Sequence, residues 1–289
     1  MENSVKIDAP CKLNFHLAVT GIRDDGFHSI ESLFQAVSLE DALTVTETAV
    51  SGECTVRCPA LELPERNTVS QAVALFREET GIYSGVRILL EKRIPAGAGL
   101  GGGSSDGAAA LKALNGLFSA GLSLPRIAEM AAKIGSDVPF FVHGGAALVS
   151  GRGETVRPIG PRTDLYGVLI WPGAHSSTPR AYGLVDAWKA AGAADPALGL
   201  TLGELEAEYR SPPRQWRFAN SFTVPVSGSL GKIAAALADI KGAGADFAEM
   251  SGSGSAVFGI FDDSDKARRA RAKLAEKWEV CVNFLLLAS

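Results

Sequence analysis

The run of residues 95–106, PAGAGLGGGSSD, constrains the fold more than any other part of the chain. It places Gly97, Gly99 and three consecutive glycines at 101–103 directly before an alanine-rich segment. Glycine loses more conformational entropy on ordering than any other residue, so an ordered run of this kind indicates positive φ angles or close approach of the backbone to a bulky group. Unpaired N–H groups at a helix start attract anions. The run therefore predicts a phosphate-binding loop that leads into a helix.

The segment after the glycines predicts an amphipathic helix. Residues 104–106, Ser-Ser-Asp, are strong N-cap types, and Leu111, Leu114 and Phe118 recur at helical spacing before Gly121 ends the pattern. A flexible Gly/Ser linker rarely adjoins a capped helix. We therefore favour an ordered loop.

Three known motifs match this loop in part, and each lacks a required feature. The Walker A motif needs lysine after the last glycine, but Ser104 follows Gly103. Residues 97–102 fit GxGxxG, but the next acid after Asp106 is Glu129, so the partner expected about 20 residues on is missing. Residues 103–107 fit the GxSxG of serine hydrolases, which needs a strand running straight into the serine. Here the apolar strand at 86–90 is separated from the serine by Pro95 and the glycines.

Composition narrows the class of protein. A hydrophobic content of 46%, a charged content of 21% and a net charge of −4 are those of an ordinary globular protein without a general attraction to nucleic acid. The basic segment 266–277 is surrounded by acidic residues, which favours a solvated helix face. The start MENSVKIDAPCK has no apolar core, and no apolar stretch approaches about 18 residues. We expect no signal peptide, no membrane span and a cytoplasmic location.

Cysteine spacing gives no metal or redox motif. Cys11, Cys54, Cys58 and Cys281 form no CxxC, and the CxxxC of the middle pair has no second ligand pair. We expect reduced, structural thiols.

Hydrophobic periodicity predicts mixed α+β layers in two halves that join near residues 157–161. The predicted strands cover residues 12–19, 43–48, 86–90, 166–171 and 280–287, with a hairpin over 248–261. The predicted helices besides that after the glycine loop cover residues 68–79, 125–134, 181–191, 230–240 and 264–278.

Five blocks of sequence resemble a known family. Residues 10–14 (PCKLN), the glycine loop and residues 251–255 (SGSGS) are similar to the GHMP small-molecule kinases. The form GLGGGSSD, with residues 21–28 (GIRDDGFH) and 135–141 (GSDVPFF), resembles the GHMP kinases that phosphorylate a cytidine-diphosphate-linked polyol with ATP in the non-mevalonate route to isoprenoids. The blocks occur in order over nearly the whole chain. The alternative within the family is a kinase of homoserine or mevalonate.

The resemblance implies a two-domain α+β fold. Residues 1–156 would form an N-terminal ATP-binding domain with the glycine loop, and residues 157–289 a ferredoxin-like C-terminal domain. Lys12 and Asp137 match the family's catalytic pair. A carboxylate can accept the proton of an alcohol nucleophile, and an ammonium offsets charge on the transferring phosphoryl group. From the residues alone, Asp137 could equally cap a helix, and Lys12 could be an exposed lysine on an edge strand.

The resemblance also implies the ligand-binding residues. ATP and magnesium would be the cofactors, with unknown metal ligands among which Ser105 is the candidate. The ATP-binding residues would be Pro95, Ala96, Gly97, Ala98, Gly99, Leu100, Gly101, Gly102, Gly103, Ser104, Ser105, Asn67, Thr68 and Lys92. The acceptor-binding residues would be Asn14, Phe27, His28, Thr178 and Tyr182, with both aromatic rings stacking on cytosine. From the residues alone, core packing is an equal alternative for those two rings. Residues 251–255 would fold against the acceptor diphosphate.

The chain departs from the family pattern at three positions. Cys11 replaces a small residue, Phe27 replaces a tyrosine, and Ser221 follows Asn220 where an aspartate is common. Two other classes stay open: a serine hydrolase with Ser105 as nucleophile, which a fluorophosphonate would label, and a silent nucleotide-binding module. The oligomeric state is not apparent from the sequence.

Overall fold

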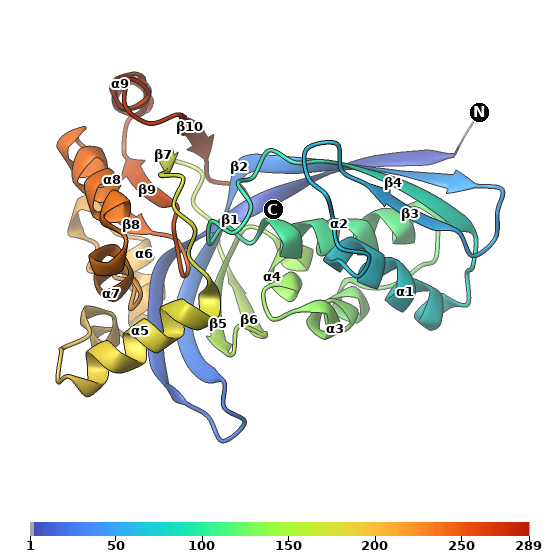
Figure 1. Ribbon diagram of the computed structural model, residues 1–289, viewed down its shortest axis with the longest axis horizontal. Coiled ribbons are helices and arrows are strands. Elements are labelled where there is room, and N and C mark those ends of the chain that lie inside the picture. Colours follow the sequence, from blue (N-terminus) through green and yellow to red (C-terminus); the bar gives the residue numbers. More distant parts are fainter. Residues whose placement is uncertain (1–2, 289) are drawn as a thin grey trace. The chain divides into compact units, whose positions relative to one another are not determined.

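The computed structural model describes residues 3–288 (Figure 1). Their contacts form two compact units whose segments interleave along the chain. The first unit contains residues up to 11, residues 39–96 and residues 101–144. The second contains residues 12–38, 97–100 and 145 onward. The division of function at residues 156 and 157 stays a prediction.

Two long strands enter both units. Strand β1 (Ser4–Ile22) pairs with strand β2 (His28–Thr48). In the first unit, the end of β2 pairs antiparallel with β4 (Gly85–Glu91), and β3 (Cys54–Arg57) runs parallel to β4. In the second unit, the start of β2 pairs antiparallel with β5 (Ala146–Gly151), which pairs with β6 (Thr155–Ile159). Pro158 lies in β6, which is an edge strand of this sheet, so the N–H that proline lacks is tolerated there.

Four helices of the described chain belong to the first unit. They are α1 (Thr68–Thr80), α2 (Gly102–Leu117), α3 (Leu124–Ile134) and α4 (Val138–His143). Helix α2 packs against α1 and α4, and α3 packs against α4. Asn67 accepts hydrogen bonds from the backbone of α1 and forms a capping box with Ser70. Such caps satisfy N–H groups that have no partner within a helix, and they explain why the predicted start of this helix is confirmed.

The second unit contains a four-stranded antiparallel sheet. Its strands are β7 (Tyr166–Trp171), β8 (Phe247–Met250), β9 (Val257–Phe261) and β10 (Val280–Leu285), in the spatial order β10-β7-β9-β8. Helices α8 (Gly231–Gly242) and α9 (Ser264–Leu274) pack on it. The chain order of strands and packed helices, β7-α8-β8-β9-α9-β10, with the first and last strands adjacent, is ferredoxin-like, as the resemblance implied.

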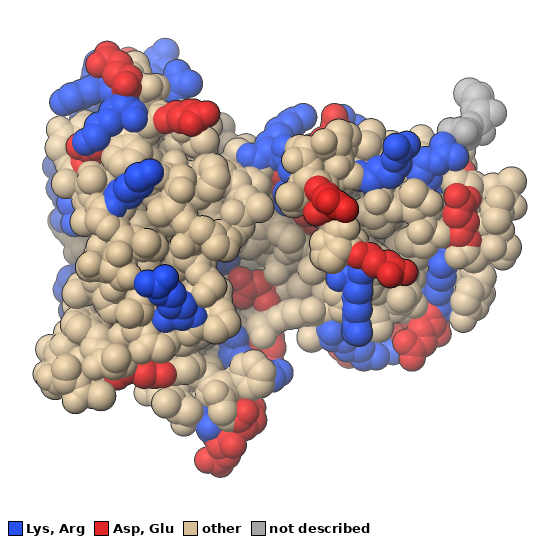
Figure 2. Space-filling model, viewed as in Figure 1, with Lys and Arg blue, Asp and Glu red and all other residues tan. Residues whose placement is uncertain are grey.

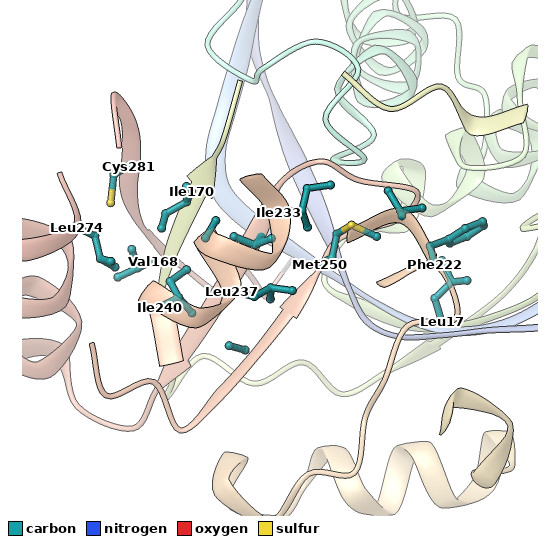
Figure 3. Close-up of a cluster of buried hydrophobic side chains, with 14 of the residues drawn as sticks. Leu17, Val168, Ile170, Phe222, Ile233, Leu237, Ile240, Met250, Leu274 and Cys281 are labelled. Carbon is teal, nitrogen blue, oxygen red and sulfur yellow. The ribbon is translucent and has the colours of Figure 1, made fainter. Parts of the chain in front are cut away.

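The hydrophobic core of this unit lies between the sheet and its helices (Figure 3). Val168 and Ile170 from β7 contact a cluster that includes Ile233 and Ile240 from α8. The long crossover from β7 to α8 contains α5 (Thr178–Ala190), η1 (Pro196–Gly199), α6 (Leu202–Tyr209), η2 (Pro213–Gln215) and α7 (Thr223–Ser229). Phe222, just before α7, joins the same core, so the crossover is anchored to the sheet.

The predicted capping of α2 was wrong. The helix begins at Gly102, its N-cap is Gly101, and that residue makes no side-chain cap. Gly101 has φ 71°, a left-handed conformation that glycine adopts without steric cost, so the helix can start before residues 104–106. The helix also ends at Leu117, earlier than Gly121.

The basic segment near the C-terminus has charges of both signs. Over α9, blue and red side chains lie side by side in Figure 2. Lys266 pairs with Asp262, and Arg268 pairs with Asp265. This mixture fits the predicted solvated face. Within residues 3–288, no helix is both long and apolar enough to cross a bilayer.

Candidate active site

Three glycines of the loop have the positive φ angles that the sequence predicted. Their values are 66° for Gly97, 81° for Gly99 and 71° for Gly101. Other residues rarely adopt such angles, and bulky ones are outliers there. The loop therefore needs glycine for its backbone path.

In the first unit, the predicted nucleotide residues gather at the start of α2. The Thr68 hydroxyl donates to the Gly103 carbonyl at 2.6 Å. The Lys92 ammonium lies 3.3 Å from where a Cβ of Gly102 would be, and Asn67 caps the neighbouring α1. The Ser105 hydroxyl is buried in the first turn of α2 and has no hydrogen-bond partner among the residues described. The structure thus brings Asn67, Thr68 and Lys92 together with residues 101–105.

Two carboxylates hold Lys92. Its ammonium donates to Asp41 at 2.5 Å and to Asp106 at 2.8 Å. Asp41 also accepts from the backbone N–H groups of Arg93 and Ile94. Burial raises the pKa of Asp106 to about 7, and Lys92 only partly opposes this. The pKa of Lys92 is raised because the two carboxylates outweigh the effect of burial. Sequence reasoning took Asp106 for a helix cap and missed this cluster.

Asp137 lies between α3 and α4, at the N-cap position of α4. Pro139 occupies the first turn of that helix. The Asp137 side chain makes no capping hydrogen bond to α4, which removes the main support for the interpretation as a cap.

In the second unit, Lys12 and Asn14 are buried on β1. Lys12 is 4% exposed, and its ammonium donates to Asn14 Oδ1 at 2.5 Å and lies 4.5 Å from the centre of the Phe34 ring. Asn14 Nδ2 donates to the Ser32 hydroxyl at 3.0 Å. Lys12 is therefore a fixed, buried cation and not an exposed strand lysine.

Residues 97–100 pack backbone to backbone against residues 251–255. The Ser251 hydroxyl donates to the Gly99 carbonyl at 3.0 Å, and the Lys12 N–H donates to the Leu100 carbonyl at 2.9 Å. A Cβ on Gly99 would lie 2.1 Å from the Ser251 carbonyl oxygen. The Thr178 and Ser253 hydroxyls are 3.1 Å apart. The SGSGS block thus supports the glycine loop, a contact that the sequence did not predict.

The turn at residues 220–222 makes hydrogen bonds to the backbone of residues 250–252, at the start of this block. Asn220 Nδ2 donates to the carbonyl oxygens of Met250 and Gly252, both at 2.8 Å. The Ser221 hydroxyl donates to Asp195 at 2.6 Å and accepts from the Val19 N–H at 2.9 Å. Ser221 stands where an aspartate is common in the family, and the buried carboxylate of Asp195 accepts its hydrogen bond. A carboxylate is therefore present at this turn, from another part of the chain.

His28 is the centre of a second group in this unit. Its Nε2 lies 2.9 Å from Asp186 Oδ1, and its ring stacks on Tyr182 with centroids 4.2 Å apart. The Phe27 side chain is 56% exposed, with the Arg152 guanidinium 4.9 Å from the centre of its ring. The structure brings His28 and Tyr182 together, and it adds Asp186, which the sequence did not single out.

Comparisons with known proteins show the family of this chain. The family GHMP kinases N terminal domain matches residues 67–145, and GHMP kinases C terminal matches residues 219–280. A 4-diphosphocytidyl-2-C-methyl-D-erythritol kinase from Treponema pallidum is 44% identical over 98% of this chain and 99% of its own length. The kinase of the same name from Synechococcus sp. strain CC9902 is 37% identical over 94% of this chain and 92% of its own.

Solved structures similar to this chain include kinases of the same family. A 4-(cytidine 5'-diphospho)-2C-methyl-D-erythritol kinase superposes with a TM-score of 0.81 at 35% identity, covering 99% of this chain and 100% of the other. A homoserine kinase from Cytophaga hutchinsonii has a TM-score of 0.73 at 21% identity, covering 100% of this chain and 96% of the other. The second likeness concerns the fold alone.

Proposed function

Because the chain belongs to the GHMP kinase family, and within it to the 4-diphosphocytidyl-2-C-methyl-D-erythritol kinases, we propose that it transfers the γ-phosphoryl group of ATP to the 2-hydroxyl of 4-diphosphocytidyl-2-C-methyl-D-erythritol. It is an ATP-dependent phosphotransferase with an alcohol acceptor, and this reaction belongs to the non-mevalonate route to isoprenoids. The observation that carries the proposal is the similarity over the whole chain, which reaches 44% identity over 98% of its length.

Asp137 is the general base of the proposed reaction. An alcohol is a weak nucleophile near neutral pH, and a positioned carboxylate that accepts its proton contributes about 10²–10⁴-fold. Asp137 lies at the N-cap position of α4, directly before the helix that begins at Val138, and the GSDVPFF block that contains it matches the resemblance. Lys12 is the cation that offsets negative charge on the transferring phosphoryl group, and its burial supports this role because charge interactions strengthen away from water.

The glycine loop and the start of α2 bind the phosphates of ATP. Backbone N–H groups at a helix start favour an anion, and the positive φ of Gly101 directs the chain into that start. Asn67, Thr68 and Lys92 lie at the same place and contact the nucleoside. Their contacts to α1 and to residues 102 and 103 support this assignment.

Magnesium is the metal of the proposed reaction, and Ser105 would hold it. The buried hydroxyl of Ser105 lacks a partner among the residues described, and oxygen ligands suit this ion. When bound, magnesium would neutralise charge on the phosphates. Ser105 lies within α2 and not at a turn between strand and helix, which disfavours the serine hydrolase alternative.

The acceptor pocket consists of Asn14, Phe27, His28, Thr178 and Tyr182. The stacked pair of His28 and Tyr182 supports a site for a flat base. Stacking on an aromatic ring is worth about 1–3 kcal/mol per base.

An acceptor panel tests the proposed function. The purified chain, ATP and magnesium are incubated with the cytidine-linked polyol, homoserine and mevalonate, and ADP release is measured. We expect turnover of the first acceptor alone. Equal or faster turnover of homoserine or mevalonate would move the assignment elsewhere in the family, and turnover of none would favour a silent nucleotide-binding module.

A further inference from the structure

Two neighbours on α5 fix the His28 ring. Tyr182 stacks on it at an interplanar angle of 18°, which sets the plane of the imidazole. Tyr182 is itself held by the edge of Phe222, whose ring centroid is 4.9 Å away. Asp186 lies one helical turn after Tyr182, and its two oxygens lie 2.9 and 3.1 Å from His28 Nε2. The carboxylate therefore sets which edge of the ring faces α5.

The chemistry of this contact decides where the imidazole proton lies. An ionised carboxylate accepts hydrogen bonds and donates none, so His28 Nε2 must carry the hydrogen. A neutral imidazole with hydrogen on Nε2 has a lone pair on Nδ1. Among residues 3–288, the structure gives His28 a side-chain hydrogen bond through Nε2 only. Nδ1 is thus left as an acceptor for a ligand.

We propose that Asp186 is a positioning residue that fixes the Nε2–H tautomer of His28, so that Nδ1 selects a base with an amino group over one with a carbonyl group. This inference rests on the proposed function, whose acceptor contains cytosine. The amino group at C4 of cytosine donates a hydrogen bond. Uracil has a carbonyl oxygen at this position, which would face the Nδ1 lone pair and leave both groups unpaired.

Nuclear magnetic resonance tests the tautomer without any turnover. The chain has four histidines, so the ¹⁵N signals of His28 can be identified by their loss in His28→Gln. At about pH 8, where imidazole is ordinarily neutral, we expect the Nε2–H tautomer. Asp186→Asn should add the other tautomer, because an amide can donate as well as accept. A wild-type His28 that carries its hydrogen on Nδ1, or on both nitrogens, would overturn the proposal.

Kinetics test the selection of the base. We would measure kcat/KM for the cytidine acceptor and for its uridine counterpart. In Asp186→Asn the preference for cytidine should fall by about tenfold, given the penalty for an unpaired polar group. The change should come from a lower KM for the uridine acceptor, with kcat for the cytidine acceptor nearly constant. A merely structural role would instead weaken both acceptors alike.

Matched variants keep this test decisive. Asp262→Asn makes the same change at a surface ion pair with Lys266 and should leave the preference unchanged. Asp186→Ala removes the partner altogether and should lower the preference as well. An unaltered preference in both Asp186 variants would refute the selection role. If the wild type phosphorylates neither acceptor, both the proposed function and the base selection are refuted. The tautomer of His28 is measured separately, by nuclear magnetic resonance, and does not depend on turnover.

Discussion

Single residues in this chain are dictated either by backbone geometry or by chemistry. Gly99 is of the first kind, because its φ of 81° and the Ser251 carbonyl 2.1 Å from its would-be Cβ exclude any side chain. The proposed function makes Asp137 a residue of the second kind, because its carboxylate would accept a proton. Residues of the two kinds should fail differently when they are substituted.

Asp137→Asn should abolish turnover and leave ATP affinity nearly unchanged. The amide keeps the shape of the side chain but accepts no proton, so kcat should fall by about 10²-fold or more. Steady-state kinetics and calorimetry with ATP measure the two effects. Asp164→Asn, at an exposed pair with Arg162, is the control and should behave as wild type. A loss of less than about tenfold would contradict a general base.

Gly101→Val should destroy ATP binding with a modest loss of stability. The branched side chain would block backbone approach to the phosphates, and it is strained at φ 71° by about 1–3 kcal/mol. Calorimetry with ATP and urea unfolding measure binding and stability. Gly116→Val places the same side chain in the same helix, where a Cβ meets nothing within 4 Å. Retained ATP affinity in Gly101→Val would show that this glycine lies away from the phosphates.

At the scale of elements, the sequence was informative where local signals suffice. Helix α1 (Thr68–Thr80) follows the predicted range 68–79 closely, because the Asn67 cap and Gly81, with φ 70°, act within a few residues. The early start of α2 was missed because Gly101, which allows it, is one of several glycines in a row, and the sequence does not show which of them ends the loop. Strand β5 was missed because its pairing with β2 joins distant residues, and β6 was missed with it because it pairs with β5. The ion pairs of Lys92 with Asp41 and Asp106 were also beyond prediction, because propensity says nothing of such partners.

That cluster should make the stability of the fold depend on pH. Burial raises the pKa of Asp106 from 3.8 to about 7, so between these values the folded chain keeps a proton that the unfolded chain releases. Its contribution to stability is therefore lost as pH rises from about 4 to 7. Asp106→Asn does not titrate. Its unfolding free energy relative to wild type should rise by about 1–3 kcal/mol over this range, as measured in urea.

Another buried group titrates in the same range with the opposite sign. Burial lowers the pKa of His16 from 6.5 to about 4, so its contribution is lost as pH falls. Because His16 is present in both proteins, its effect cancels in the difference between wild type and Asp106→Asn. A difference that stays constant from about pH 4 to 8 would show that Asp106 keeps an ordinary pKa.

At the scale of the whole chain, the family was predictable because glycine-rich and charged blocks keep their spacing over residues 10–255. The contacts among these blocks were not, because they join segments far apart, as Gly99 and Ser251 do. The acceptor specificity also belongs to this scale. In the proposed function the base is held by Phe27, His28 and Tyr182, whereas the reacting groups are served by Lys12 and Asp137. Recognition of the base is therefore assigned to different residues from the transfer of the phosphoryl group.

The base should accordingly contribute to the rate of phosphoryl transfer as well as to binding. Binding energy from a remote group can hold the reacting hydroxyl in line with the γ-phosphate, and substrates that lack such a group lose kcat as well as KM. Free 2-C-methyl-D-erythritol 4-phosphate should therefore be a very poor acceptor, with lower kcat and higher KM than the cytidine-linked substrate. Measuring both constants for each acceptor, and again with added free cytidine diphosphate to fill the pocket, tests this. Equal kcat for the two acceptors would mean that the pocket binds the base without aligning the hydroxyl. Equal kcat/KM would mean that the enzyme does not recognise the cytosine, which would contradict the proposed pocket.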